Sequence, residues 1–132
     1  MEKWLFVVLV VWINVSCQAP NQEYLVGKWK LDSVHYHYNN FSHSSTGWYQ
    51  EEIYEYLPTD ELIVRAVDAY IKIPISINGR EIHHLDGQGK PEETYRIIKL
   101  EKSNLVLKVE NTPLFSGKNQ TRYEIRYFSK VP

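Results

Sequence analysis

The amino-acid sequence predicts an all-β fold, a small antiparallel up-and-down barrel of about eight strands with little or no helix. From Gln18 to Pro132, short runs of alternating apolar and polar residues are separated by turn signals at nearly regular spacing. Asn78-Gly79 joins two of these runs directly, and this dipeptide is the strongest short-range signal for a hairpin. The chain of 132 residues also contains 10 Tyr and 4 Trp, and aromatic residues are enriched in strands.

The first strand is predicted to begin at Gly27, because Trp29, Leu31 and Ser33 then share one face at the strand period of two. It is followed by a polar loop predicted from Asn39 to Gly47. The later strands are predicted over Trp48 to Leu57, from Leu62 onward, and over Ala69 to Ile77, Glu81 to Leu85, Thr94 to Leu100, Leu105 to Val109 and Tyr123 to Phe128.

The alternation within the later strands predicts which side chains face the core. Leu105, Leu107 and Val109 point the same way and are expected to be buried. In the last strand, the aromatic and aliphatic residues are predicted to face inward and the charged residues outward. The inner set is Tyr123, Ile125 and Tyr127, and the outer set is Arg122, Glu124 and Arg126.

This regular succession of strands suits an antiparallel sandwich or a barrel. An eight-stranded barrel is favoured because closure removes the free edges, and a barrel of this size can enclose one small ligand. Strands of only about five or six residues are short for a wide barrel. A filled interior is therefore the alternative to a ligand cavity.

Length and charge exclude several classes of protein. A chain of this length suits one domain. The net charge of −1 gives no basic excess for binding nucleic acid. The single cysteine, Cys17, has no internal partner and so cannot belong to an internal disulfide framework.

The N-terminus reads as a signal peptide. Trp4 to Ile13 is an unbroken apolar run that follows Lys3. The run is shorter than the roughly 20 residues that a membrane span needs, but it suits the hydrophobic core of an export signal. The predicted division is a signal peptide over 1–16, a short tether over 17–23 and one barrel domain over 24–132.

Val15-Ser16-Cys17 resembles the bacterial lipobox, in which small residues precede an invariant Cys; Asn14 departs from it, since Leu is usual there. The resemblance implies cleavage before Cys17 and a membrane anchor of diacylglycerol plus an acyl chain such as palmitate on that residue. Gln18 is not the Asp that resembles an inner-membrane retention signal. The expected localisation is therefore the outer membrane of a Gram-negative bacterium, on the periplasmic side. The alternative is an ordinary secretory signal in which Cys17 is incidental.

Gly27-Lys28-Trp29 resembles the Gly-x-Trp element that opens lipocalin-like (calycin) domains. The later layout is similar, in order and spacing, to the small lipocalin-like lipoproteins of Bacteroidetes, and the similarity covers most of the chain from Tyr24 to Val131. The matching stretches are Tyr54 to Leu62, Tyr95 to Leu100 and Tyr127 to Val131. The resemblance implies a barrel that binds a small hydrophobic or amphipathic ligand.

Gly27 and Trp29 have expected structural roles. A Gly permits an unusual φ or a close backbone approach at the strand entrance, and a Trp beside it can plug one end of a barrel. In lipocalins a basic side chain from the last strand packs over this Trp as a cation–π contact. The candidates for that contact are Arg126 and Lys130, and the alternative is that Trp29 is simply a core residue and Arg126 a solvated one.

Groups that could carry catalysis or bind metal are few, and neither an enzyme nor a cofactor or metal site is expected. His35 and His37 share a strand face, but only His43 lies near enough in sequence to add a third zinc ligand. His83 and His84 are adjacent and should lie on opposite faces. The carboxylates are explained by a charged outer face; they are Glu51, Glu52, Glu55 and Glu61.

The better candidates for function are tyrosines predicted to converge inside the barrel, since each offers an apolar ring and a hydroxyl that can orient a ligand. They are Tyr54, Tyr56, Tyr95, Tyr123 and Tyr127. The expected function is binding of a small ligand by a lipid-anchored envelope protein. The rival is a protein–protein interaction module, such as an inhibitor, immunity or assembly factor. Its contact surface would be the loops Asn39 to Gly47 and Asn111 to Asn119 on a filled barrel.

Overall fold

The computed structural model describes residues 21–39, 41–46, 52–110 and 121–132. A short 3-10 turn, η1 (Gln22–Tyr24), precedes nine strands. The strands are β1 (Gly27–Tyr38), β2 (Phe41–Thr46), β3 (Ile53–Leu57), β4 (Glu61–Ala66), β5 (Ala69–Asn78), β6 (Glu81–Leu85), β7 (Pro91–Leu100), β8 (Asn104–Glu110) and β9 (Arg122–Lys130).

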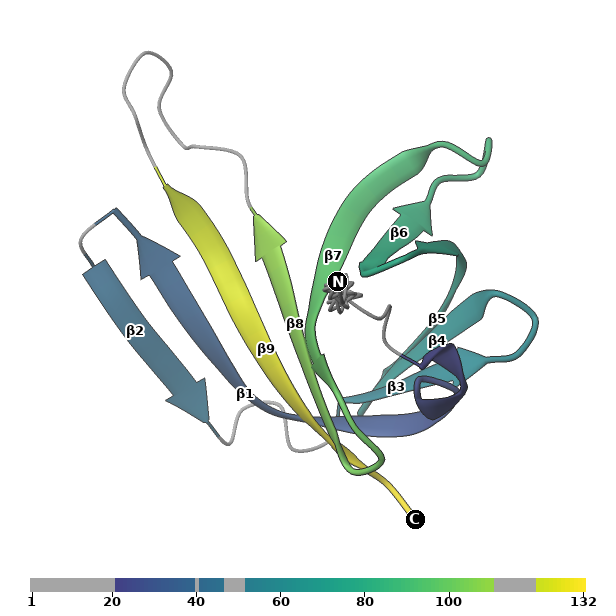
Figure 1. The fold of residues 1–132 in the computed structure, drawn as a ribbon, viewed down its shortest axis with the longest axis horizontal. Helices are drawn as coiled ribbons and strands as arrows, with labels where there is room; N and C mark the ends of the chain where they lie inside the picture. Colours follow the sequence, from purple (N-terminus) through teal and green to yellow (C-terminus); the bar gives the residue numbers. More distant parts are fainter. Residues whose placement is uncertain (1–20, 40, 47–51, 111–120) are drawn as a thin grey trace, which may run out of the picture.

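Eight of these strands close into an antiparallel barrel. β1 pairs with β3, each strand from β3 to β9 pairs with the next, and β9 returns to β1. β2 pairs only with β1 and stands beside the closed ring; Figure 1 shows it at the left edge, away from β4, β5 and β6. The predicted all-β, up-and-down barrel is confirmed, as is the hairpin at Asn78-Gly79, where Gly79 has a φ of 60°.

β1 is long enough to serve two neighbours on one of its edges. Gly27 to Lys30 pair with β3, and Ser33 to Tyr38 pair with β2. Along its other edge it pairs with β9, with a bulge between Leu31 and Ser33. A bulge bends a strand and increases its twist, and here it separates the part of β1 inside the barrel wall from the part that carries β2.

The predicted polar loop from Asn39 to Gly47 is wrong, because Phe41 to Thr46 form β2. The strand escapes recognition because it lies outside the ring, where neither of its faces must be apolar. Asn39 has a φ of 52°, a conformation that Asn tolerates in hairpin turns. The predicted strand from Trp48 is also too long at its start, since β3 begins at Ile53 and residues 47–51 lie outside the described part.

The core fills the inner face of the barrel. Every ring strand contributes at least one buried or half-buried apolar residue to it. Leu105, Leu107 and Val109 are at most 2% exposed, which confirms the predicted inner face of β8.

The predicted faces of β9 are wrong. Arg126 pairs with the buried Leu107, and Phe128, itself 2% exposed, pairs with Leu105. Arg126 and Glu124 therefore point inward, whereas Tyr123, Ile125 and Tyr127 point outward. Both faces of β9 carry apolar residues, so alternation alone could not decide, and pairing with β8 sets the register.

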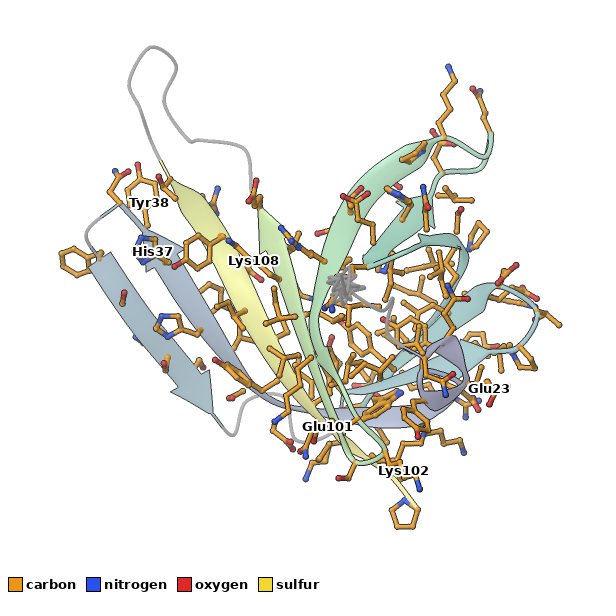
Figure 2. The ribbon with its side chains drawn as sticks, in the orientation of Figure 1. Glu23, His37, Tyr38, Glu101, Lys102 and Lys108 are labelled. Carbon is orange, nitrogen blue, oxygen red and sulfur yellow. The ribbon has the colours of Figure 1, made fainter. Side chains whose placement is uncertain are left out.

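Neighbouring side chains cover the outer face of β9 at Tyr123 but not at Tyr127. The Tyr123 ring stacks on His37 with 4.6 Å between ring centroids, and the Lys108 Nζ lies 4.4 Å from the Tyr123 ring centroid. Figure 2 shows His37 on β1 and Lys108 on β8, on either side of β9. Tyr127 is 41% exposed.

One end of the barrel is closed by Trp29, which is fully buried and donates a hydrogen bond from Nε1 to the Leu25 carbonyl over 2.8 Å. The Lys130 Nζ lies 4.5 Å from the Trp29 ring centroid, so Lys130 and not Arg126 makes the cation–π contact. Gly27 has a φ of 130°, and a Cβ there would lie 2.5 Å from the Lys130 Nζ. The Lys130 side chain could shift away, but a φ of 130° is a backbone conformation that other residues rarely adopt, and it explains why this position is glycine.

The signal peptide predicted over 1–16, the lipidation site Cys17 and the loop Asn111 to Asn119 lie outside the described residues. Among the residues that are described, no helix is long and apolar enough to cross a membrane.

Candidate ligand site in the barrel interior

A layer of polar side chains crosses the barrel interior between the closed end and the mouth. Three of the five predicted tyrosines belong to this region: Tyr54, Tyr56 and Tyr95 face inward and are at most 5% exposed. The other two, Tyr123 and Tyr127, lie on the outer face of β9 and cannot line the interior. Two residues that sequence reasoning did not assign here, Arg126 and His84, complete the layer.

Arg126 is the centre of this layer. Its Nη1 donates to the Tyr54 hydroxyl over 2.9 Å, and its Nε and Nη2 donate to Oε2 of Glu124 over 3.3 and 3.1 Å. The guanidinium also lies 5.4 Å from the ring centroid of Tyr95. Burial alone would lower the pKa of Arg126, but Tyr54, Tyr95 and Glu124 raise it above its ordinary value. The interior therefore holds a permanent cation.

The Tyr54 hydroxyl links Arg126 to a second carboxylate. It accepts from Arg126 and donates to Oε1 of Glu52 over 2.9 Å. Burial raises the pKa of Tyr54 well above its ordinary value, although Arg126 opposes the rise. Burial likewise raises the pKa of Tyr56 and Tyr95. These hydroxyls keep their protons and act as hydrogen-bonding groups.

Two buried polar atoms have no partner among the described residues: the Nε2 of His84 and the hydroxyl of Tyr56. His84 packs against Tyr95 with 4.6 Å between ring centroids and is 7% exposed. Burial, assisted by Arg126, lowers the pKa of His84 to about 4, so the ring is neutral at pH 7. Buried polar atoms are normally hydrogen-bonded to protein or water. These two therefore mark a place for water or for the polar end of a ligand.

Two carboxylates face the barrel interior on the side of the mouth. Glu124 pairs with Val109 and Glu93 with His84 in the strand registers, which places both carboxylates on the inner face. Glu93 lies near enough to Tyr95 to contribute to the raised pKa of that hydroxyl, after burial as the main cause. Glu124 is half-buried and Glu93 is exposed.

An open depression of about 1230 Å³ adjoins this mouth. Its lining includes Ile73 and His84 from the inner face and Arg96 and Lys108 from the outer face of the same wall. The depression therefore reaches over the edge of the barrel, and its volume is not that of an enclosed chamber.

The other histidines do not converge. His35 and His37 lie on the outer face of β1 and contact Ser44 and Ser42 through Nδ1 at 2.8 and 3.2 Å. His43 stacks on Tyr36, on the opposite face. No group of three or more potential metal ligands occurs among the described residues. His83 and His84 lie on opposite faces, as predicted, with His83 bonded to Thr94 on the outside.

The predicted carboxylates separate as well. Glu55 and Glu61 form ion pairs on the outer face with Arg65 and Lys72, at 3.4 and 2.9 Å. Glu52 joins the interior cluster through Tyr54, and Glu51 lies outside the described residues. Arg126 shares its face of β9 with Phe128, so an inward Phe128 implies an inward Arg126. Alternation alone does not show which face of β9 is the inner one, because both faces carry apolar residues.

Comparisons of the chain with models of protein families, with curated proteins and with solved structures found no match.

Proposed function

We propose that this is a lipid-anchored, lipocalin-like protein of the bacterial cell envelope, which binds a small amphipathic ligand inside its barrel. The observation that carries the proposal is the polar layer around Arg126, with the unpartnered atoms of His84 and Tyr56, inside an otherwise apolar core. A few convergent polar groups in an apolar pocket are typical of small-molecule sites. A barrel that only needed a filled core would avoid the cost of burying them.

The closed end supports the family part of the proposal. Lys130 of the last strand packs over Trp29 of the first, beside Gly27. This is the arrangement that the resemblance to lipocalins implies.

Binding is favoured over catalysis by the protonation states of the layer. The raised pKa of each buried tyrosine and the lowered pKa of His84 leave these groups neutral at pH 7. General acid–base catalysis works best when the pKa of the acting group lies near the working pH. Neutral hydroxyl and imidazole groups instead suit hydrogen bonding to a ligand.

The test is native mass spectrometry of the protein purified from its own host. A bound small molecule, released on denaturation and absent after His84→Phe, which removes one of the unpartnered polar atoms, is the expected result. Protein that carries no such molecule, and that does not take up a neutral environment-sensitive dye, would overturn the proposal.

A second candidate function is a protein–protein interaction module, and β2 is the observation that favours it. β2 ends the strand order, so its outer edge has no partner strand among the described residues. Phe41, at its start, is 79% exposed. An open edge can accept an added strand from another protein. A photo-crosslinker at Ser44 that captures a defined envelope protein in cells, with an empty barrel, would support this candidate over the first.

A further inference from the structure

The charges inside the barrel indicate which polar end a ligand should have. Arg126 is already paired with Glu124 through two nitrogens and with the Tyr54 hydroxyl through a third. Its charge is therefore compensated before any ligand binds. Two further carboxylates, Glu52 and Glu93, face the same layer through Tyr54 and Tyr95.

The described inner-face residues of this layer thus include three carboxylates and one guanidinium, which contacts Glu124 directly, and the surplus charge is negative. His84 adds no positive charge at pH 7, since burial lowers its pKa to about 4. Arg122 shares the inner face of β9, but it lies four residues beyond Arg126, opposite Tyr38 at the far end of β1. At about 3.3 Å per residue, it stands roughly 13 Å further out.

The two unpartnered polar atoms can accept hydrogen bonds from a ligand that carries N–H groups. A neutral imidazole presents one nitrogen as an acceptor, and a tyrosine hydroxyl can accept as well as donate. The Nε2 of His84 and the hydroxyl of Tyr56 can therefore receive N–H groups from a ligand, and Glu52 and Glu93 supply the opposite charge. A fatty-acid carboxylate would instead meet like charges and an arginine that is already occupied.

From this we infer that the barrel selects an amphipathic amine, with its protonated nitrogen among Glu52, Glu93, His84 and Tyr56 and its apolar part against the core. The inference rests on the proposed function and names the ligand class of the same site.

The experiment uses the full chain in phospholipid nanodiscs, with empty nanodiscs as the blank. A neutral environment-sensitive dye is bound first and then displaced by octylamine, octan-1-ol or octanoate, which share a chain length and differ in the polar end. We expect octylamine to displace the dye at a concentration at least about tenfold lower than octanoate, because like charges a few ångströms apart repel strongly in a partly buried site.

Variants of the two carboxylates test whether they cause the preference for octylamine over octanoate. Glu52→Gln and Glu93→Gln should each reduce the difference between the concentrations at which octylamine and octanoate displace the dye. The double variant should abolish this difference. Gln keeps an oxygen that can accept from the Tyr54 hydroxyl, so folding should be preserved, and dye binding reports this directly. The control is Glu101→Gln, which removes a carboxylate next to the β7–β8 turn, where the Glu101 side chain is 55% exposed and pairs with Lys99.

The outcomes separate the two proposals. If the dye does not bind at all, the proposed ligand-binding function fails. If the dye binds but octanoate displaces it as well as octylamine does, the function stands and the amine inference is overturned. An octylamine preference that survives the double variant unchanged also overturns the inference.

Discussion

Tyr54 and Tyr56 point from the same strand into the same core, yet their hydroxyls meet different surroundings. The Tyr54 hydroxyl accepts from Arg126 and donates to Glu52, whereas the Tyr56 hydroxyl has no partner among the described residues. Both rings are almost fully buried. Removing each hydroxyl in turn therefore compares the stability contributed by a hydrogen-bonded buried hydroxyl with the stability lost by burying an unpaired one.

Tyr54→Phe should lower the free energy of unfolding by about 1–3 kcal/mol, because Arg126 and Glu52 each lose a hydrogen-bond partner. Tyr56→Phe should leave it unchanged or raise it slightly, since an unpaired buried hydroxyl is removed. Urea unfolding followed by tryptophan fluorescence measures both. Equal losses in the two variants would mean that the Tyr56 hydroxyl is bonded to water in the ligand-free protein.

His84 should make stability depend on pH. Burial, together with Arg126, lowers its pKa to about 4, against 6.5 for the ordinary group. The unfolded chain therefore binds the proton more readily than the folded barrel does. The contribution of His84 to the free energy of unfolding is fully present above pH 6.5 and is lost as the pH falls through about 4. The total loss is about 3 kcal/mol.

Urea unfolding at pH 7, 5.5 and 4.5 tests this. His84→Phe should remove most of that pH dependence, because Phe keeps an apolar ring against Tyr95 and has no proton to gain. His83→Gln, on the outer face, should leave the dependence as it is in the wild type. A His84→Phe profile that overlays the wild-type profile would show that other groups, such as the carboxylates, cause the loss.

At the scale of elements, the closed end joins β1 to β9 through Trp29 and Lys130. Trp29→Ala should cost about 3–5 kcal/mol, as expected for truncating a fully buried aromatic residue. Lys130→Met should cost about 0.5–2 kcal/mol, because it removes the cation–π contact. The same change also removes the 2.7 Å hydrogen bond to the Val26 carbonyl. Denaturant midpoints compare the two, and a Lys130→Met loss as large as that of Trp29→Ala would contradict this ranking.

β2 should be dispensable for the barrel, because it pairs only with the far half of β1. Ser44→Pro should change the free energy of unfolding by no more than about 1 kcal/mol, since Pro is tolerated in edge strands. Val106→Pro is the matched variant in β8, which is hydrogen-bonded on both edges. It should prevent folding, because Pro removes a ladder hydrogen bond inside the ring. Circular dichroism distinguishes these outcomes, and an unfolded Ser44→Pro variant would show that β2 is required.

At the scale of the whole molecule, the predicted lipid on Cys17 should decide where the barrel resides without affecting its fold. Cys17→Ser should abolish membrane association, because the acyl chains are lost, and leave the circular dichroism spectrum of the barrel unchanged. Cell fractionation after fatty-acid labelling measures this. Wild-type protein that takes up no label, or a variant that still sediments with membranes, would contradict the lipoprotein prediction.

The sequence by itself determined the class of the fold and most of its strands. Local patterns carry this information: alternation reports a strand with one buried face, and Asn78-Gly79 reports a tight hairpin. Gly27 and Trp29 could likewise be singled out from short-range pattern and resemblance, and in the structure both lie beside Lys130.

Only the tertiary structure decided what lies inside the barrel. β9 has apolar residues on both faces, and a shift of one residue exchanges the faces, so pairing with β8 was needed to turn Arg126 inward and Tyr123 and Tyr127 outward. β2 was missed for a related reason, since a polar strand outside the ring has no hydrophobic period to detect. The candidate site depends on pairing between strands far apart in the sequence, and local periodicity does not report such pairing.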